Sequence, residues 1–111
     1  MRKKKPIPEK FLAVMADRFG ALADGTRLAI LQCLMHDGER NVTHIVAATG
    51  RSAANVSKHL RHLRDRGLVA RRKDGLQVYY RLDDPVVEKL CHLVCESLLD
   101  ELGEEFGADP C

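Results

Sequence analysis

The segment 51–82 constrains the fold more than any other part of this 111-residue chain, because a helical pattern leads there directly into a hairpin pattern. The apolar residues of its first half recur at i, i+4 and i+7, the spacing of one buried helix face: Val56, Leu60 and Leu63. Ser52 can cap such a helix at its start, and Gly67 can end it. We therefore expect a helix over about 52–66 that is buried on one face only.

Two runs with high β propensity, 68–72 and 77–82, follow this helix. They flank Lys73-Asp74-Gly75-Leu76, in which Asp-Gly is a strong signal for a tight turn. A two-stranded hairpin is marginally stable in water, so it must pack against a helical core. The sequence thus predicts a hairpin beside the helix over 52–66.

The rest of the chain is predicted to be helical. Amphipathic helices are expected over 9–22 and 26–36, a short one begins at Asn41 or Thr43 and is closed by Gly50, and a last one follows Asp84-Pro85. A short helix, a turn with glycine and a second helix with a polar leading end are typical of a helix-turn-helix. The predicted fold is mainly α with a small β-hairpin, a winged helix-turn-helix in the order α-α-α-α-β-β-α. One domain is expected over 9–106, with a flexible basic arm over 1–8 and a tail over 107–111.

Charge is unevenly distributed along the chain. The net charge is only +2, yet the segment 51–73 carries eight bases: Arg51, Lys58, Arg61, Arg64, Arg66, Arg71, Arg72 and Lys73. Only Asp65 and Asp74 oppose them in the helix and hairpin, whereas the chain from Asp83 onward is acidic with Lys89 as its one base. A local positive surface indicates a polyanionic partner, and helix and hairpin together suit a DNA groove and the adjacent backbone.

Composition narrows the class of protein further. No apolar stretch reaches the roughly 20 residues of a membrane span, and MRKKKP lacks the apolar core of a signal peptide. We therefore expect a cytoplasmic protein without a membrane partner, in which Cys33, Cys91, Cys95 and Cys111 are free thiols, metal ligands or redox groups. The sequence contains no nucleophile and base in a recognisable catalytic setting, so we do not expect an enzyme.

Two stretches, ALADGTRLAILQCL and VTHIVAATGRSAANVSKHLRHLRDRGLVARRKDGLQVYYRL, resemble the ArsR/SmtB family of bacterial winged-helix repressors. The resemblance covers about 19–84, with Gly25 where the family usually has proline. It implies a homodimer that pairs its first and last helices, binds double-stranded DNA at an inverted-repeat operator, and leaves the operator when an inducer binds.

The resemblance and the charge pattern together select the DNA-binding candidates. Near the start of the fourth helix, Ser52, Asn55 and Lys58 can reach base edges, while the neighbouring arginines suit phosphates. By family position, the hairpin over 71–77 is the wing. The full candidate set is Arg51, Ser52, Ala54, Asn55, Ser57, Lys58, His59, Arg61, Arg71, Arg72, Lys73 and Gln77.

The candidate sensor lies in the last helix. The segment 41–46 lacks the cysteine pair of one family metal site, and Val86 and Ser97 stand where a second, zinc-binding site has histidines. Cys91 and Cys95 remain, one helical turn apart on the same face, where they could share a soft ion. A complete As(III), Cd(II) or Zn(II) site would need further donors: Cys111, Cys33, His92 or a residue of the other subunit.

Three other interpretations stay open. The cysteines could sense redox state or reactive sulfur, with Cys33 joining Cys91 or Cys95, as the resemblance to sulfur-sensing family members implies. They could also pack as small hydrophobic residues and sense nothing. Finally, the winged helix could bind a protein instead of DNA, as a non-sensing interaction module.

Overall fold

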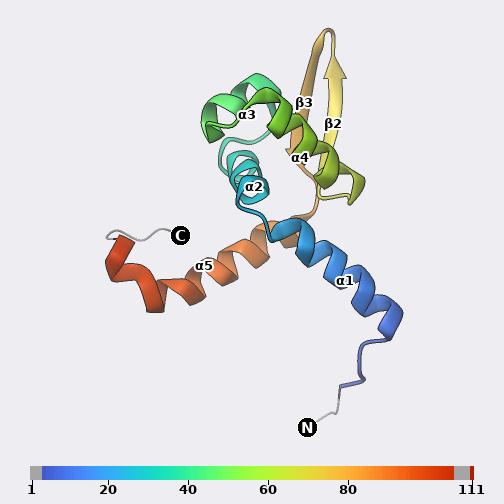
Figure 1. Cartoon of the computed structure of the whole chain (residues 1–111), viewed down its shortest axis with the longest axis vertical. Helices are drawn as coiled ribbons and strands as arrows, with labels where there is room; N and C mark the ends of the chain where they lie inside the picture. The colour runs from blue at the N-terminus through green and yellow to red at the C-terminus, as the bar shows by residue number, and fades with distance from the viewer. Residues whose placement is uncertain (1–3, 107–110) are drawn as a thin grey trace.

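The structure is a computed structural model that describes residues 4–106 and Cys111 (Figure 1). Residues 4–8 of the expected arm are exposed and precede the first helix. The first three residues of that arm, and 107–110 of the expected tail, lie outside the described residues. Within the described part, no helix has the length and apolar character that a membrane crossing requires.

The five helices of the described chain begin and end close to the expected positions: α1 (Glu9–Leu22), α2 (Gly25–Asp37), α3 (Val42–Thr49), α4 (Ala53–Asp65) and α5 (Pro85–Phe106). Side chains cap three of them. Asp24, Asn41 and Ser52 accept hydrogen bonds of 2.9, 2.9 and 3.1 Å from the backbone amides three residues further on. Such caps satisfy amides that a helix start leaves without partners. Gly50 ends α3 at a φ of 70°, in the left-handed region that glycine tolerates best.

Three antiparallel strands form the sheet: β1 (Arg40–Asn41), β2 (Val69–Asp74) and β3 (Gln77–Leu82). Their spatial order is β1-β3-β2, so β3 lies in the middle. Strand β3 has the expected bounds, whereas β2 runs two residues further than expected, to Asp74, which pairs with Gln77 and leaves the two-residue turn Gly75-Leu76. Gly75 adopts a φ of 63° there, as a type II′ hairpin turn requires of its first central residue. The sequence did not indicate β1, because two residues are too few to show alternation.

The core lies where α2, α3 and α4 meet the sheet. The predicted buried face of α4 is confirmed, since Val56, Leu60 and Leu63 are all 0% exposed. Ile30 and Ile45 contribute the facing side chains from α2 and α3. Burying residues of this size removes enough apolar surface from water to hold α4 firmly against the body of the protein.

Helices α1 and α5 extend away from this core in different directions (Figure 1). Their apolar residues are largely exposed in the single chain, with Phe11 at 63%, Val14 at 62% and Leu93 at 64%. Exposed apolar side chains at this density on two helices indicate a surface that another molecule covers.

Candidate nucleic-acid interface and cysteine site

The exposed side of α4 carries most of the predicted DNA-binding side chains. Because Val56, Leu60 and Leu63 fix the buried face, the remaining positions of this helix turn toward solvent. The exposed members of the predicted set on and just before this helix are Ser52, Ala54, Asn55, Ser57, Lys58 and Arg61. The hydroxyl of Ser52 is occupied as the cap of α4, so Asn55 and Lys58 keep the freest polar groups near the helix start.

Two predicted residues are held by the protein itself. His59 is half-buried, and its Nδ1 lies 3.5 Å from Nη1 of Arg27, a residue of α2. Arg51 donates a hydrogen bond of 2.8 Å to the carbonyl oxygen of Thr49, at the end of α3. His59 therefore links α4 to α2, whereas Arg51 makes a local contact in the turn between α3 and α4.

Strand alternation divides the basic residues of the wing between two faces. Arg71 and Lys73 lie on the face that also carries their cross-strand partners Tyr80 and Val78. Arg72 lies on the opposite face, which the sequence-based grouping of these three residues did not anticipate. Figure 1 shows the β2–β3 hairpin extending past α4, so its tip projects on the same side of the molecule as the helix-turn-helix.

Arg72 is already neutralised by the protein. Its guanidinium lies 2.7 Å from Glu39 Oε1 and 3.6 Å from Asp74 Oδ2, and it stacks 4.8 Å above the centre of the Tyr79 ring. The hydrogen bond that Arg72 donates to the Glu39 carboxylate raises the pKa of Arg72. On the same face, Gln77 accepts a hydrogen bond of 3.2 Å from the side chain of Asn41.

The cations available to a phosphate backbone are therefore fewer than the sequence suggests. Arg66, like Arg72, has an acidic partner, since Asp17 of α1 lies 3.1 Å from its Nε. Four exposed bases of α4 and the wing take part in none of the ion pairs of the described residues: Lys58, Arg61, Arg71 and Lys73. Unpaired surface cations on a helix and an adjacent wing provide the electrostatic part of DNA binding.

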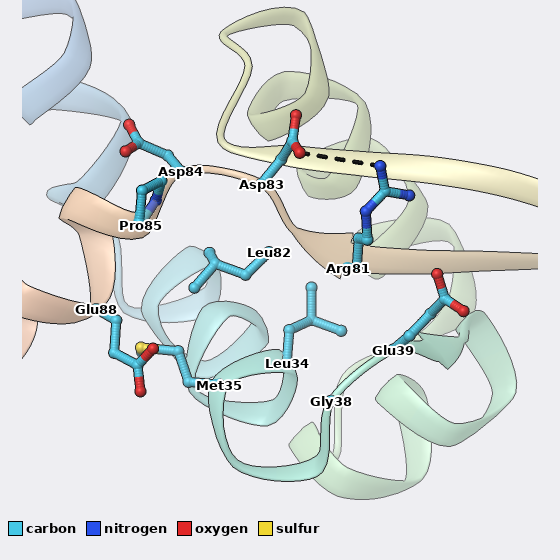
Figure 2. Close-up of a pocket in the computed structure, with 10 residues that line it drawn as sticks. All are labelled: Leu34, Met35, Gly38, Glu39, Arg81, Leu82, Asp83, Asp84, Pro85 and Glu88. Atoms are coloured by element: carbon cyan, nitrogen blue, oxygen red, sulfur yellow. Dashed lines mark ion pairs between the residues drawn. The ribbon is translucent and has the colours of Figure 1, made fainter.

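An acidic pocket lies on a different part of the molecule (Figure 2). It is lined by the end of α2, the end of β3 and the start of α5, and its carboxylates are Glu39, Asp83, Asp84 and Glu88. The one base in the lining, Arg81, pairs with Asp83 at 3.9 Å. Carboxylates repel phosphate, so this side of the protein does not suit DNA.

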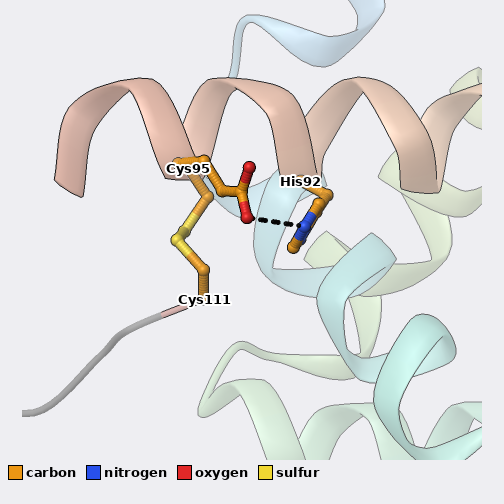
Figure 3. The surroundings of a disulfide bond; sticks show 4 residues. His92, Cys95 and Cys111 are labelled. Atoms are coloured by element: carbon orange, nitrogen blue, oxygen red, sulfur yellow. Dashed lines mark ion pairs between the residues drawn. A yellow bond between two sulfur atoms is a disulfide. The ribbon is translucent and has the colours of Figure 1, made fainter. Parts of the chain in front are cut away.

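The last-helix cysteines differ in state. Cys95 is joined to Cys111 by a disulfide, with the two Cα atoms 5.9 Å apart (Figure 3). Cys91 is a free thiol. The sequence-based expectation for these cysteines was that they are free thiols, metal ligands or redox groups. Burial raises the pKa of the Cys91 thiol. Nearby on α5, His92 pairs with Glu96 at 3.1 Å.

Cys91 and Cys95 open into an apolar groove between α1, α2 and α5. The other side chains of the groove are apolar: Phe19, Leu22, Ala23, Leu28, Leu90, Val94 and Leu98. The pair thus lies on the part of the protein where exposed apolar surface is concentrated. That position is compatible with both open interpretations of these residues, a thiol site at an interface between helices and simple apolar packing.

Cys33 lies on another side of α2. It is buried, and it is five residues from Leu28, which places the two side chains about 140° apart around the helix. Its cavity is lined by α2 and α3, whereas Cys91 lines the groove on the Leu28 side. The alternative in which Cys33 joins Cys91 or Cys95 is not present in this structure, in which Cys95 is bonded to Cys111.

A polar cluster around Asp37 was missed by the sequence analysis. Asp37 Oδ2 lies 2.8 Å from His44 Nε2 and 3.7 Å from Cys33 Sγ, while Asp37 Oδ1 lies 2.7 Å from His36 Nδ1. These hydrogen bonds, first that of His44, lower the pKa of Asp37 to about 2. The i, i+4 spacing of Cys33 and Asp37 was visible in the sequence, but the approach of His44 depends on the turn between α2 and α3.

Comparison with known proteins agrees with this geometry. Residues 22–72 match the family described as a helix-turn-helix domain. The chain is 36% identical to the HTH-type transcriptional regulator KmtR of Mycobacterium tuberculosis over 77% of this chain and 65% of that protein. It is 38% identical to a cadmium resistance transcriptional regulatory protein, a CadC homologue of Staphylococcus aureus, over 80% of this chain and 74% of that protein.

Solved structures share the architecture. The antimony-specific transcriptional repressor AntR superimposes with a TM-score of 0.82 at 29% identity, over 94% of this chain and 93% of AntR. The homodimeric winged helix-turn-helix domain Mb0332 of Mycobacterium bovis, described as a possible ArsR-family regulator, gives a TM-score of 0.71 at 37% identity over 91% and 92% of the two chains. The predicted winged helix-turn-helix fold is confirmed. The chain belongs to the ArsR family of winged helix-turn-helix transcriptional regulators, which are DNA-binding proteins and not enzymes.

Proposed function

We propose that this protein is a homodimeric transcriptional repressor that binds an inverted-repeat operator. The observation that carries the proposal is the set of unpaired cations Lys58, Arg61, Arg71 and Lys73 beside a helix-turn-helix. The exposed apolar residues of α1 and α5 support dimerisation through these helices, and the similar domain Mb0332 is a homodimer. A two-fold dimer presents its recognition helices to two half-sites about one DNA turn apart.

Within each half-site, we assign different contacts to α4 and to the wing. The amide of Asn55 and the ammonium of Lys58 contact base edges in the major groove, because they are exposed near the start of α4. Arg61, Arg71 and Lys73 contact phosphates, which adds affinity without sequence information. His59 and Arg72 instead hold α4 and the wing in position, through Arg27 and Glu39 respectively.

Hydroxyl-radical footprinting on the DNA upstream of the protein's own gene tests this arrangement. We expect two protected regions related by two-fold symmetry and separated by about 10–10.5 base pairs or a multiple of that spacing. Protection that lacks two-fold symmetry contradicts the dimeric mode. Failure to protect any DNA supports the rival function, a winged helix that binds a protein.

We further propose that a thiophilic ion releases the repressor by binding at Cys91 and Cys95. The support is their position in the groove between α1, α2 and α5, and the presence of Cys111 beside Cys95. After reduction of the disulfide, one chain can offer three thiolates, as many as a trigonal As(III) site needs. Cd(II) or Zn(II) prefers four ligands and would take a fourth donor, such as His92 or a group of the second subunit. Two similar proteins are described by elements that bind thiolates well: one is a cadmium resistance regulatory protein, and the other is an antimony-specific repressor.

The structure offers a physical route from this groove to the DNA-binding helix. Asp17 of α1 holds Arg66, which follows α4, in an ion pair of 3.1 Å. Arg27 donates hydrogen bonds of 2.7 and 3.2 Å to the carbonyl oxygens of Ala21 and Gly20 at the end of α1, and it also contacts His59 of α4. An ion that shifts α1 against α5 therefore shifts α4, which gives the two states different affinities for DNA.

Cysteine variants test the sensor. In the presence of a phosphine reductant, arsenite should release wild-type protein from DNA, while Cys91→Ser and Cys95→Ser should bind DNA normally and resist release. Cys33→Ser is the matched control, because Cys33 lies outside the groove. A Cys91→Ser, Cys95→Ser double variant that responds to arsenite and cadmium with the wild-type dose dependence rules out this site.

The Cys95–Cys111 disulfide favours a second candidate signal, thiol oxidation. In this alternative the oxidised and reduced proteins differ in DNA affinity without any metal. Cys111→Ser abolishes such a response, whereas Cys33→Ser leaves it unchanged. Intact-protein mass spectrometry separates the two mechanisms directly, because oxidation removes two hydrogen atoms per disulfide and ion binding adds the mass of the ion.

A further inference from the structure

We propose that Cys33, Asp37 and His44 form a binding site for a borderline divalent cation such as Zn²⁺, separate from the last-helix cysteines. One sulfur, one oxygen and one nitrogen donor lie within 4.8 Å of one another in this cluster. Cys33 and Asp37 come from successive turns of α2, and His44 comes from α3. Zn²⁺ is bound by this combination of ligand types in proteins.

The separation of the sulfur and oxygen donors suits an ion of this size, and the nitrogen donor would have to shift. Ligand bonds of about 2.0–2.3 Å at tetrahedral angles place a sulfur and an oxygen donor about 3.6 Å apart. The separation of Cys33 Sγ and Asp37 Oδ2 is 3.7 Å. His44 Nε2 is closer to Asp37 Oδ2, at 2.8 Å, and moves outward by roughly 0.6 Å when a cation replaces the shared proton.

Burial, an outer hydrogen bond and an adjoining cavity make the surroundings of the cluster suitable for a cation. Cys33 is 7% exposed, so its sulfur is shielded from bulk solvent. Asp37 also accepts a hydrogen bond from His36, the kind of outer contact that orients a carboxylate ligand. An open cavity lined by Cys33, His36 and Asp37 adjoins the cluster, and it gives an ion a path from solvent and room for a water as the fourth ligand.

Binding must release a proton. The Cys33 thiol becomes a thiolate, and its pKa is raised by burial and by the neighbouring Asp37 carboxylate. His44 binds through Nε2 as the neutral ring, so the proton that Nε2 shared with Asp37 moves to Nδ1, and the thiol proton is the one that leaves for each cation bound. Affinity should consequently rise about tenfold per pH unit while the thiol of the free protein is protonated.

The site would join α2 to the first helix of the helix-turn-helix. His44 lies in the first turn of α3, whose cap Asn41 also pairs with Gln77 of the wing. A cation here therefore stabilises the folded arrangement of α2, α3 and the base of the wing, by mass action on the native state.

Cobalt(II) added to the reduced, full-length protein tests the proposal, because a cobalt–thiolate bond gives a charge-transfer band in the near ultraviolet. We expect one Co²⁺ per chain and a band that disappears in Cys33→Ser and persists in Cys91→Ser. The thermal midpoint should rise with Co²⁺ in the wild type and in Cys91→Ser, but not in Cys33→Ser. Since loss of an outer-shell partner already weakens metal binding about 10–100-fold, His44→Gln should weaken it at least tenfold. His44 is 41% exposed, so this variant keeps the core intact if Cys33→Ser does not fold.

His36→Gln is the matched control on the outer contact, and it should retain the band with reduced affinity. A band that survives Cys33→Ser and His44→Gln but is lost in Cys91→Ser would move the ion to the last helix, which overturns this site and leaves the proposed sensor standing. No stoichiometric Co²⁺ binding above neutral pH overturns it outright.

Discussion

The division of the wing into two faces makes a quantitative prediction. If Arg71 and Lys73 each contact one phosphate per protomer, a dimer loses two contacts for each substitution to alanine. The slope of log affinity against log salt is about −0.9 per phosphate contact, so Arg71→Ala or Lys73→Ala should each flatten it by about 1.8. Between 50 and 200 mM salt, that difference amounts to roughly a 12-fold smaller loss of affinity than the wild type shows.

Arg72→Ala is the matched control, since the same side chain one residue away is held by Glu39 at 2.7 Å on the other face. Its slope should stay within about 0.5 of the wild type. Fluorescence anisotropy with the DNA upstream of the protein's own gene, at five or more salt concentrations, measures all three slopes. If Arg72→Ala flattens the slope as much as Arg71→Ala does, strand alternation does not decide which cations meet the DNA, and the reasoning fails.

Three further predictions concern α4, the core and the Asp37 cluster. Asn55→Ala should lose about 1–3 kcal/mol of discrimination at one base pair per half-site, whereas Arg61→Ala should weaken binding to all sequences alike; affinities for a set of single-base operator variants distinguish these effects. Leu60→Ala, at a side chain that is 0% exposed, should lower the free energy of unfolding by about 2–5 kcal/mol in urea titrations. Leu76→Ala, at the fully exposed wing tip, should change the free energy of unfolding by less than about 0.5 kcal/mol. Equal effects of Leu60→Ala and Leu76→Ala would contradict the assignment of Leu60 to the core. Because the pKa of Asp37 is lowered from 3.8 to about 2, its contribution to stability is present above pH 3.8 and lost as the pH falls through 2. Asp37→Asn should remove that part of the acid dependence of the thermal midpoint, and an unchanged profile would show that the cluster does not stabilise the fold.

Local patterns in the sequence were sufficient for most of the fold. The period of Val56, Leu60 and Leu63 identified the buried face of α4, and Ser52 identified its start. These features depend on residues within a few positions of one another, so the chain itself displays them. The two-residue strand β1 showed no such pattern and was missed.

The parts of the site that could not be predicted depend on residues far apart in the chain. Arg72 and Glu39 are 33 positions apart in the chain. Whether Arg72 is free for DNA or paired within the protein therefore depends on a contact that the local sequence does not display. The contact of His59 with Arg27 spans 32 positions. Charge counts over segment 51–73 therefore overstated the number of cations free for phosphate.

Cysteine chemistry was also set by tertiary structure. Cys91 and Cys95 were recognisable as a pair by their spacing, but a separation of 16 positions gave no indication that Cys95 bonds to Cys111. Cys33 was visible as a candidate, yet its neighbours Asp37 and His44 follow from the turn between α2 and α3. Sequence spacing finds ligands on one helix and misses those that a turn brings together.

The central claim, that this protein is a sequence-specific DNA-binding regulator, is tested most directly by its affinity for two duplexes at physiological salt. One duplex carries the DNA upstream of its own gene, and the other has the same base composition in scrambled order. We expect a selectivity of at least about 10³ for the first duplex, with salt-sensitive binding to both. Equal affinity for the two duplexes, or no binding at submicromolar protein, would contradict it.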